Sequence, residues 1–277
     1  MKTALSEAVI NIILREIEKL CSENLVINKI LRTDVFTLLE AQNCTVLYYP
    51  VEDEIRGLRI KKYVGDKYED FVYINTARSE SEQVFAAAHE LGHLIGIDEL
   101  VCRELNLKQE RKICEDIIDR FAAELLMERN AFSMHVSGKA QEYLNASGMV
   151  TGMDMIRIIV YLMDTFQVPY EAVVRRMYET ERIDKTAKDD LLNDIQSMTG
   201  ILEKIIDEGN YRRLKPTNVK AIGELSKYLK LLEENDLISE KRLVNIEKTF
   251  DLKDIEENED VYVGSIRIER ENTNEGY

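Results

Sequence analysis

The chain has 277 residues, which is enough for one large domain or two modest ones. Its net charge of -15 argues against a nucleic-acid-binding surface, because such a surface needs basic side chains to neutralise phosphates. We therefore expect no direct contact with nucleic acid, although an acidic protein can still bind a basic protein partner.

The sequence also argues against membrane insertion and secretion. Its most apolar run, 156–163, is interrupted by Arg157 and is far shorter than the ~20 residues of a membrane span. Charged residues interrupt the amino-terminal segment, which indicates an amphipathic helix rather than a secretory signal. The four cysteines form no C-x-x-C pair, which favours reduced thiols in a cytoplasmic protein.

In chain order, the first predicted elements are two helices and three strands. Apolar residues at helical spacing predict helices over 3–20 and 34–41. Runs of β-branched and aromatic residues predict strands over 45–51, 55–63 and 71–75. A turn-like stretch at 64–67 joins the last two strands into a hairpin. We expect the three strands to form a small antiparallel sheet.

Helical patterns dominate the remainder of the chain. Further helices are predicted over 80–97, 108–129, 154–166 and 170–178. After about residue 186 the character changes, and charged amphipathic helices are predicted over 191–206 and 219–235. The run 254–260 is expected to be an acidic loop, 261–269 a strand and the last residues disordered.

These patterns predict an α+β fold that is mainly helical. The small antiparallel three-stranded sheet would lie beside the helix predicted over 80–97, followed by a mostly helical carboxyl-terminal extension. We divide the chain into an amino-terminal domain, 1–183, and an extension, 184–277. The apolar helix faces of the extension must be buried. They would pack onto the amino-terminal domain, bind a substrate or partner, or form a homo-oligomer.

The segment FAAAHELGHLIG, residues 85–96, is the most informative part of the chain. His89 and His93 are four residues apart on a predicted helix, so their side chains lie on one face, one turn apart. Two imidazoles at this spacing suit one tetrahedral zinc ion. Glu90 follows the first histidine, where its carboxylate can take a proton from water on the metal. The pattern predicts a zincin-type H-E-x-x-H helix with Glu90 as the catalytic base. The amino-terminal domain, 1–183, is therefore the expected zinc metallopeptidase, or catalytic, domain.

A catalytic zinc site needs a third protein ligand, and three acids compete for this role. Glu99 occupies the position at which the pattern H-E-x-x-H-x-x-G-x-x-H has histidine. Glu115 and Glu124 share one predicted helix but are nine residues, or about 900°, apart and so face opposite ways. Asp119 shares the face of Glu115 and suits the hydrogen bond that usually orients a ligand histidine. Glu115 is therefore favoured, while Glu124 and Glu99 stay open.

Three motifs follow one another along the chain: FVYIN at 71–75, FAAAHELGH at 85–93 and E-x-x-x-D-x-F-A-A-E-L-L-M at 115–127. Together they resemble the ImmA/IrrE zinc metallo-endopeptidase family over roughly residues 30–180. The third motif also resembles the helix of thermolysin-like enzymes that carries the third zinc ligand. Ile118 and Glu128 stand where the family usually has alanine and proline, and these departures concern packing and helix termination rather than ligands.

The resemblance implies a cytosolic endopeptidase of bacteria, phages or mobile elements with one zinc ion. Members of the family commonly cleave a DNA-binding repressor, so a protein substrate of this kind is implied. The segment 164–177 resembles the stretch that follows the zinc helices in the family. That stretch can be mistaken for a DNA-reading helix-turn-helix, but the net charge argues against contact with DNA.

The remaining site residues are weaker candidates. The strand 71–75 directly precedes the metal helix, and in zinc peptidases such a strand can pair with an extended substrate. Asn75 at its end is a candidate to bond a substrate carbonyl. His135 is the one histidine outside the motif and a candidate for a role near the site. The sequence does not identify the group that would stabilise the oxyanion.

Two classes of function stay open at this stage. The first is an active zinc endopeptidase that cuts a regulatory protein. The second is a non-proteolytic regulator that keeps a zinc site for structure or for sensing a signal. The presence of Glu90 favours the first class, because a structural zinc site needs no general base.

Overall fold

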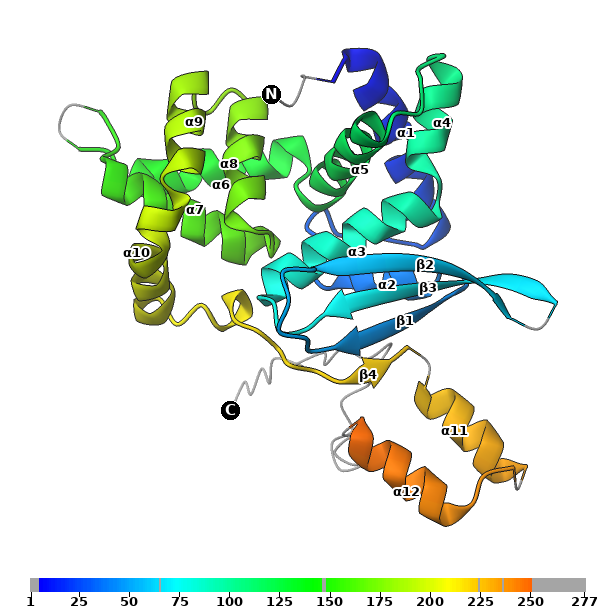
Figure 1. Ribbon diagram of the computed structural model, residues 1–277. Helices are drawn as coiled ribbons and strands as arrows, with labels where there is room; N and C mark the ends of the chain where they lie inside the picture. Colours follow the sequence, from blue (N-terminus) through cyan, green and yellow to red (C-terminus); the bar gives the residue numbers. More distant parts are fainter. Residues whose placement is uncertain (1–4, 65, 146–147, 224, 236, 251–277) are drawn as a thin grey trace, which may run out of the picture.

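The computed structural model describes residues 5–64, 66–145, 148–223, 225–235 and 237–250. This part of the chain is mainly helical and contains a four-stranded sheet (Figure 1). None of its helices is both long and apolar enough to cross a membrane. The acidic loop expected at 254–260 and the strand expected at 261–269 lie outside the described residues.

The sheet is mixed, with the strand order β2-β3-β1-β4. Its strands are β1 (Cys44–Tyr49), β2 (Gly57–Val64), β3 (Lys67–Asn75) and β4 (Ala221–Ile222). β2 and β3 form the expected antiparallel hairpin, but β1 pairs with β3 in parallel and with β4 in antiparallel orientation. The prediction of an antiparallel three-stranded sheet is therefore wrong in the number of strands and in the direction of β1.

The parallel pairing follows from the path of residues 50–56, which connect β1 to β2. This segment carries the chain past the position of β3, so that β2 begins one strand further from β1. The hairpin then returns β3 into the gap between β2 and β1, and β3 consequently runs in the direction of β1. Periodicity along the sequence reveals the strands, but it does not reveal the path of the segment that connects them.

One face of the sheet is covered by α2 (Asp34–Glu40) and α3 (Glu80–Leu94) (Figure 1). α3 packs in turn against α5 (Arg111–Leu126), and α1 (Glu7–Glu23) and α4 (Ile97–Glu104) lie beside α5. The helix predicted over 80–97 ends at Leu94, and α4 was not predicted. Gly96 has a φ of 68°, a left-handed conformation that ends the first helix before α4 begins.

Six further helices of the described residues pack against one another and form a second group. They are α6 (Arg129–Glu142), α7 (Gly152–Phe166), α8 (Tyr170–Glu179), α9 (Lys185–Asn193), α10 (Ile195–Glu208) and the short 3₁₀ helix η1 (Arg212–Leu214). α6 was not predicted, and the helix predicted over 191–206 is interrupted at Asp194. α11 (Leu225–Glu234) and α12 (Glu240–Thr249) follow β4. Within the range 219–235, which was predicted as one helix, Ala221 and Ile222 therefore form a strand and the helix starts only at Leu225.

Residues 212–223 attach the carboxyl-terminal region to the rest of the chain. The Thr76 hydroxyl donates a 2.7 Å hydrogen bond to the carbonyl of Val219, and Leu214 is buried in the core. The N–H of Gly223 donates to the carbonyl of Val46 at 2.8 Å. The predicted extension therefore contributes a strand to the sheet of the predicted catalytic domain, although the boundary at 183/184 itself stays a prediction.

We expect removal of residues 225–277 to preserve the fold, because this cut leaves every strand of the described sheet in place. Removal of 184–277 deletes β4 and the buried Leu214, and we expect it to lower the melting temperature by roughly 5 °C or more. Thermal unfolding followed by circular dichroism compares both truncations with the full chain. Equal melting temperatures for the two truncations would show that residues 184–224, which include β4 and Leu214, add nothing to stability.

Candidate metal centre

Helix α3 carries His89, Glu90 and His93, and its start is fixed by a capping box. The Ser79 side chain accepts a hydrogen bond from the N–H of Glu82, and the Glu82 side chain accepts one from the N–H of Ser79. These bonds satisfy backbone donors that a helix otherwise leaves free at its first turn. The capping box therefore holds the amino-terminal end of the helix that carries both histidines.

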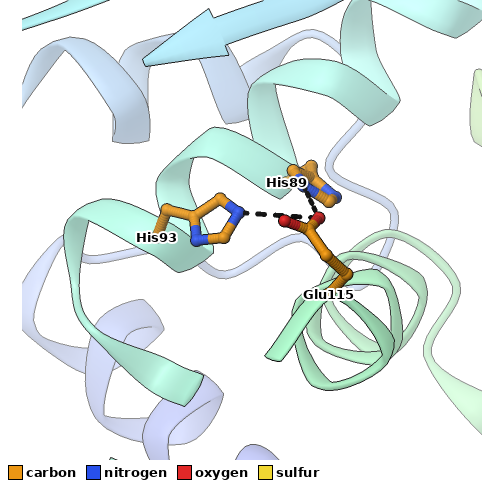
Figure 2. A group of neighbouring side chains, drawn as sticks. All are labelled: His89, His93 and Glu115. Atoms are coloured by element: carbon orange, nitrogen blue, oxygen red, sulfur yellow. Dashed lines mark ion pairs between the residues drawn. The ribbon is translucent and has the colours of Figure 1, made fainter. Parts of the chain in front are cut away.

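Glu115, from the first part of α5, faces the two histidines (Figure 2). Its Oε2 lies 3.3 Å from Nε2 of His89 and 3.9 Å from Nε2 of His93. One ligand atom from each of the three residues lies within 4.8 Å of the other two. In the part of the chain that the structure describes, this is the one group of three His, Cys, Asp or Glu side chains spaced to hold a metal ion.

The donor set fits zinc. Zinc bonds of about 2.0–2.1 Å to nitrogen or oxygen, arranged as a tetrahedron, place neighbouring donor atoms about 3.3 Å apart. The distance from Glu115 to His89 already has this value, and the distance of 3.9 Å to His93 needs only a small side-chain rotation. Two imidazoles and one carboxylate leave a fourth tetrahedral position open, as in catalytic zinc sites.

Asp119 lies one turn after Glu115 on α5 and orients the ring of His89. Its Oδ1 is 3.1 Å from Nδ1 of His89, so the imidazole can donate there and leave Nε2 facing Glu115. Burial lowers the pKa of His89, but the hydrogen bond with Asp119 and the neighbouring carboxylates outweigh burial and raise the pKa on balance. This carboxylate–histidine pairing is the usual way in which proteins orient a metal-binding imidazole.

Gly92 allows α3 and α5 to approach closely beside this group. A β-carbon placed on Gly92 would lie 2.9 Å from Cδ1 of Phe121 and 3.2 Å from Cδ1 of Ile118. Carbon atoms in contact normally stay about 3.5–4.0 Å apart, so a larger residue would push the helices apart. The histidines come from α3 and Glu115 comes from α5, and the helix separation therefore decides whether the three side chains meet.

Glu90 lines the same cavity as the metal group, a space of ≈ 380 Å³. The residue is 7% exposed. Burial raises the pKa of Glu90 and the charge of Glu115 adds to this effect, while His89 and Arg59 act in the opposite direction without cancelling it. A carboxylate with a raised pKa suits the transfer of protons near neutral pH.

The comparison with protein families identifies the relationship. Residues 39–178 match the sequence profile of the IrrE N-terminal-like domain, Peptidase M78. The chain belongs to this family. The matched range contains Glu90 and the three residues of the metal group, and the family is one of metallopeptidases.

A solved structure shows a more distant similarity. A Mycobacterium tuberculosis transcriptional regulator is 15% identical to this chain, with a TM-score of 0.40. The similarity covers 63% of this chain and 47% of the regulator, so the chain spans about half the length of that protein. A likeness at this level carries no argument about function. The comparison with curated proteins gave no match.

In this Peptidase M78 protein, β2 borders the metal centre and has no strand on its outer edge among the described residues. β3 lies between β2 and β1, so both of its edges are occupied and the expectation that 71–75 pairs with a substrate is wrong. β2 is the outer strand of the described sheet. A β-carbon at Gly57 would lie 3.4 Å from Oε1 of Glu90, which shows how closely β2 passes the carboxylate.

The other two candidate ligands lie away from the metal group. Glu124 is buried on the opposite face of α5, where Arg176 bonds both of its carboxylate oxygens, at 2.8 and 2.5 Å. Arg120 pairs with the same carboxylate at 2.6 Å. These cations lower the pKa of Glu124 although burial alone would raise it. Glu99 is exposed on α4 and is not part of the metal group.

Asn75 and His135 make contacts outside the metal cavity. The Asn75 amide donates to the carbonyls of Val51 (2.9 Å) and Ile55 (2.8 Å), and its oxygen accepts from the N–H of Val51 at 3.0 Å. Asn75 is fully buried, and these bonds hold the segment that leads from β1 to β2. His135 bonds the Tyr161 hydroxyl through Nδ1 at 2.8 Å and does not line the cavity.

The sequence analysis missed two residues that line the cavity, Gly57 and Arg59. Both come from β2, where alternate residues share one face of the strand. The alternation could have shown that they lie on the same side. It could not show that this side meets α3, because that depends on the strand order.

We expect Glu115→Gln to lose zinc but keep the fold, because the Glu115 side chain is 43% exposed and holds no buried partner. Glu124→Gln should keep zinc but lose about 3 kcal/mol of folding free energy, since it weakens a buried ion pair with Arg176. Metal analysis and urea unfolding measure the two effects. Glu99→Gln is the control and should change neither the zinc content nor the stability. Zinc loss in Glu124→Gln alone would show that the third ligand lies on the face of α5 that carries Glu124, and that Glu115 was chosen wrongly.

We expect Asn75→Ala to destabilise the protein by about 1–3 kcal/mol, because the backbone groups of Val51 and Ile55 lose the buried amide that bonds them. Urea unfolding of the metal-free protein measures this change. If Asn75 served mainly as a substrate contact, the variant would unfold at the same urea concentration as the wild type.

Proposed function

We propose that this Peptidase M78 protein is a zinc-dependent endopeptidase that cuts a cytosolic regulatory protein. The observation that carries the proposal is the meeting of His89, His93 and Glu115 in a cavity that also contains the buried Glu90. A purely structural site would gain nothing from a buried carboxylate with a raised pKa beside its ligands.

His89, His93 and Glu115 would hold the zinc ion, and Asp119 would orient His89. When bound, zinc supplies a Lewis acid that makes water more acidic and a carbonyl more electrophilic. Glu90 would accept a proton from the attacking water at its carboxylate and deliver it to the leaving amine.

The outer edge of β2 would position the substrate. An extended peptide can add to a free strand edge through backbone hydrogen bonds, and β2 is the outer strand of the described sheet. Because Gly57 has no side chain, a peptide on this edge would pass close to Glu90. Extended binding of this kind favours an internal, locally unfolded segment of a protein chain.

A DNA-binding repressor is the proposed class of substrate, as the family resemblance implies. The net charge of this chain is -15, and DNA-binding proteins carry basic surfaces, so long-range attraction would favour their encounter. The proposed location is the cytoplasm, where such a substrate is found.

We expect Glu90→Gln to keep its zinc and fold but to lose peptide cleavage, because an amide does not accept the proton. The zinc-loaded wild type and the zinc-loaded Glu90→Gln variant are each incubated with peptides from a bacterial proteome. Each is also incubated with purified repressors encoded beside the gene of this chain. Mass spectrometry detects the new termini. A loss of at least ~100-fold is expected from removal of a general base.

Glu99→Gln is the matched control, since it makes the same chemical change at an exposed acid outside the cavity. This variant should cleave at the rate of the wild type. Cleavage by Glu90→Gln at the rate of the wild type would overturn the assigned base. Absence of cleavage by every form would favour the alternative, a regulator that keeps a zinc site without proteolysis.

A further inference from the structure

Arg59 is a charged residue of the metal cavity to which the proposed reaction gives no role. It lies on the outer strand β2, and it lines the cavity together with His93 and Glu115. Its side chain is 28% exposed. A cation beside a metal-binding group needs an explanation, because two positive charges repel each other.

Contacts on both sides hold the Arg59 guanidinium in place. Asp70, on the neighbouring strand β3, accepts through Oδ1 from Nε at 2.9 Å and lies 2.9 Å from Nη2. Nη1 donates to the backbone carbonyl of His93 at 3.0 Å. A guanidinium is a rigid planar fork, so the pairing with Asp70 fixes the direction in which Nη1 points.

The bonded carbonyl belongs to the last turn of α3, which ends at Leu94. The N–H of Gly96 also donates to this carbonyl, at 3.3 Å, and a cation at the carboxyl-terminal end of a helix is favoured by the helix dipole. The carbonyl and the imidazole of His93 belong to the same residue. A bond that holds the carbonyl therefore limits movement of the turn that directs the ring toward Glu115.

We propose that Arg59 is a positioning residue of the metal centre. Anchored by Asp70, it holds the carbonyl of His93 and so keeps the imidazole aimed at Glu115. This links the outer strand of the sheet to one ligand of the metal group. The proposal rests on the metal site of the proposed function but does not depend on peptide cleavage.

Positioning and charge predict opposite effects when the arginine is removed. Loss of a cation beside the site would by itself tighten the binding of zinc. Loss of the hold on His93 weakens binding, and residues that orient metal ligands typically account for 10–100-fold in affinity. Weaker zinc binding after removal of the arginine therefore indicates positioning, and tighter binding indicates a charge effect.

The experiment has two readouts, both taken at one pH. Zinc affinity is measured by competition with a chelating indicator, and the visible spectrum is recorded for the cobalt-substituted protein. We expect Arg59→Gln to bind zinc at least ~10-fold more weakly and to alter the cobalt spectrum. Arg59→Lys should fall between it and the wild type, since lysine keeps the charge and one donor but not the fork. Asp70→Asn, which loosens the anchor, should also weaken binding.

Arg56→Gln is the matched control. Arg56 precedes β2 and pairs with Glu82 at 2.9 Å, so the variant removes the same charge and a similar ion pair without touching His93. Glu82 keeps its pairing with Arg78 at 2.8 Å and its capping-box bonds with Ser79. Its zinc affinity should stay within about twofold of the wild type, the size of a weak surface charge effect.

Unchanged or tighter zinc binding by Arg59→Gln overturns the proposal, and so does an equal loss in Arg56→Gln. If Arg59→Gln does not fold, Asp70→Asn decides, and unchanged affinity in that variant overturns the proposal. Failure of the wild type to bind zinc would instead remove the metal site on which the proposed function rests. Failure of the wild type to cleave peptides would leave the result on Arg59 standing.

Discussion

Where α3 passes α5, Gly92 faces the side chains of Phe121 and Ile118, and the geometry of the whole site depends on this contact. Both side chains are fully buried, and a single added carbon on Gly92 would lie 2.9 and 3.2 Å from their nearest atoms. A close-packed core does not absorb such an intrusion locally, so the helices would separate. Since the ligands stand on different helices, such a separation would move Glu115 away from the two histidines.

The predictions that the structure matches are those that depend only on how residues are spaced around one helix. His89, Glu90 and His93 lie within five consecutive residues, so one helical turn fixes their relative positions. Glu115 was separated from Glu124 by the same argument, because nine residues place them on opposite faces of α5. Neither step required knowledge of what lies elsewhere in the chain.

The predictions that failed depend on contacts between distant segments. The parallel pairing of β1 with β3 depends on the path of residues 50–56, and β4 is a two-residue strand that forms only because β1 offers it an edge. The substrate contact of Asn75 stays a prediction, because an asparagine at the end of a strand is as suitable for a substrate as for a turn. The structure shows its amide buried against residues 51–55, and burial of this kind cannot be derived from local sequence.

The connections around β2 relate these separate features. Asn75 holds the segment that delivers the chain to Gly57, and Arg59 joins the same strand to the last turn of α3. The edge on which a substrate would lie is therefore positioned at its start by a buried amide and further along by a guanidinium. Both residues come from a region in which the sequence shows only the alternation of a strand.

α5 is held from its other side as well. Arg176 of α8 is 1% exposed, and it bonds Glu124 and also the carbonyl of Met127 at 3.0 and 2.7 Å. The segment 164–177 can be mistaken for a DNA-reading motif, yet this arginine points into the protein and cannot reach a phosphate. Gly92 brings α3 against one face of α5, and Arg176 ties α8 to the opposite face. The ion pair of Glu124 thus contributes to the metal centre indirectly, by fixing the helix that presents Glu115.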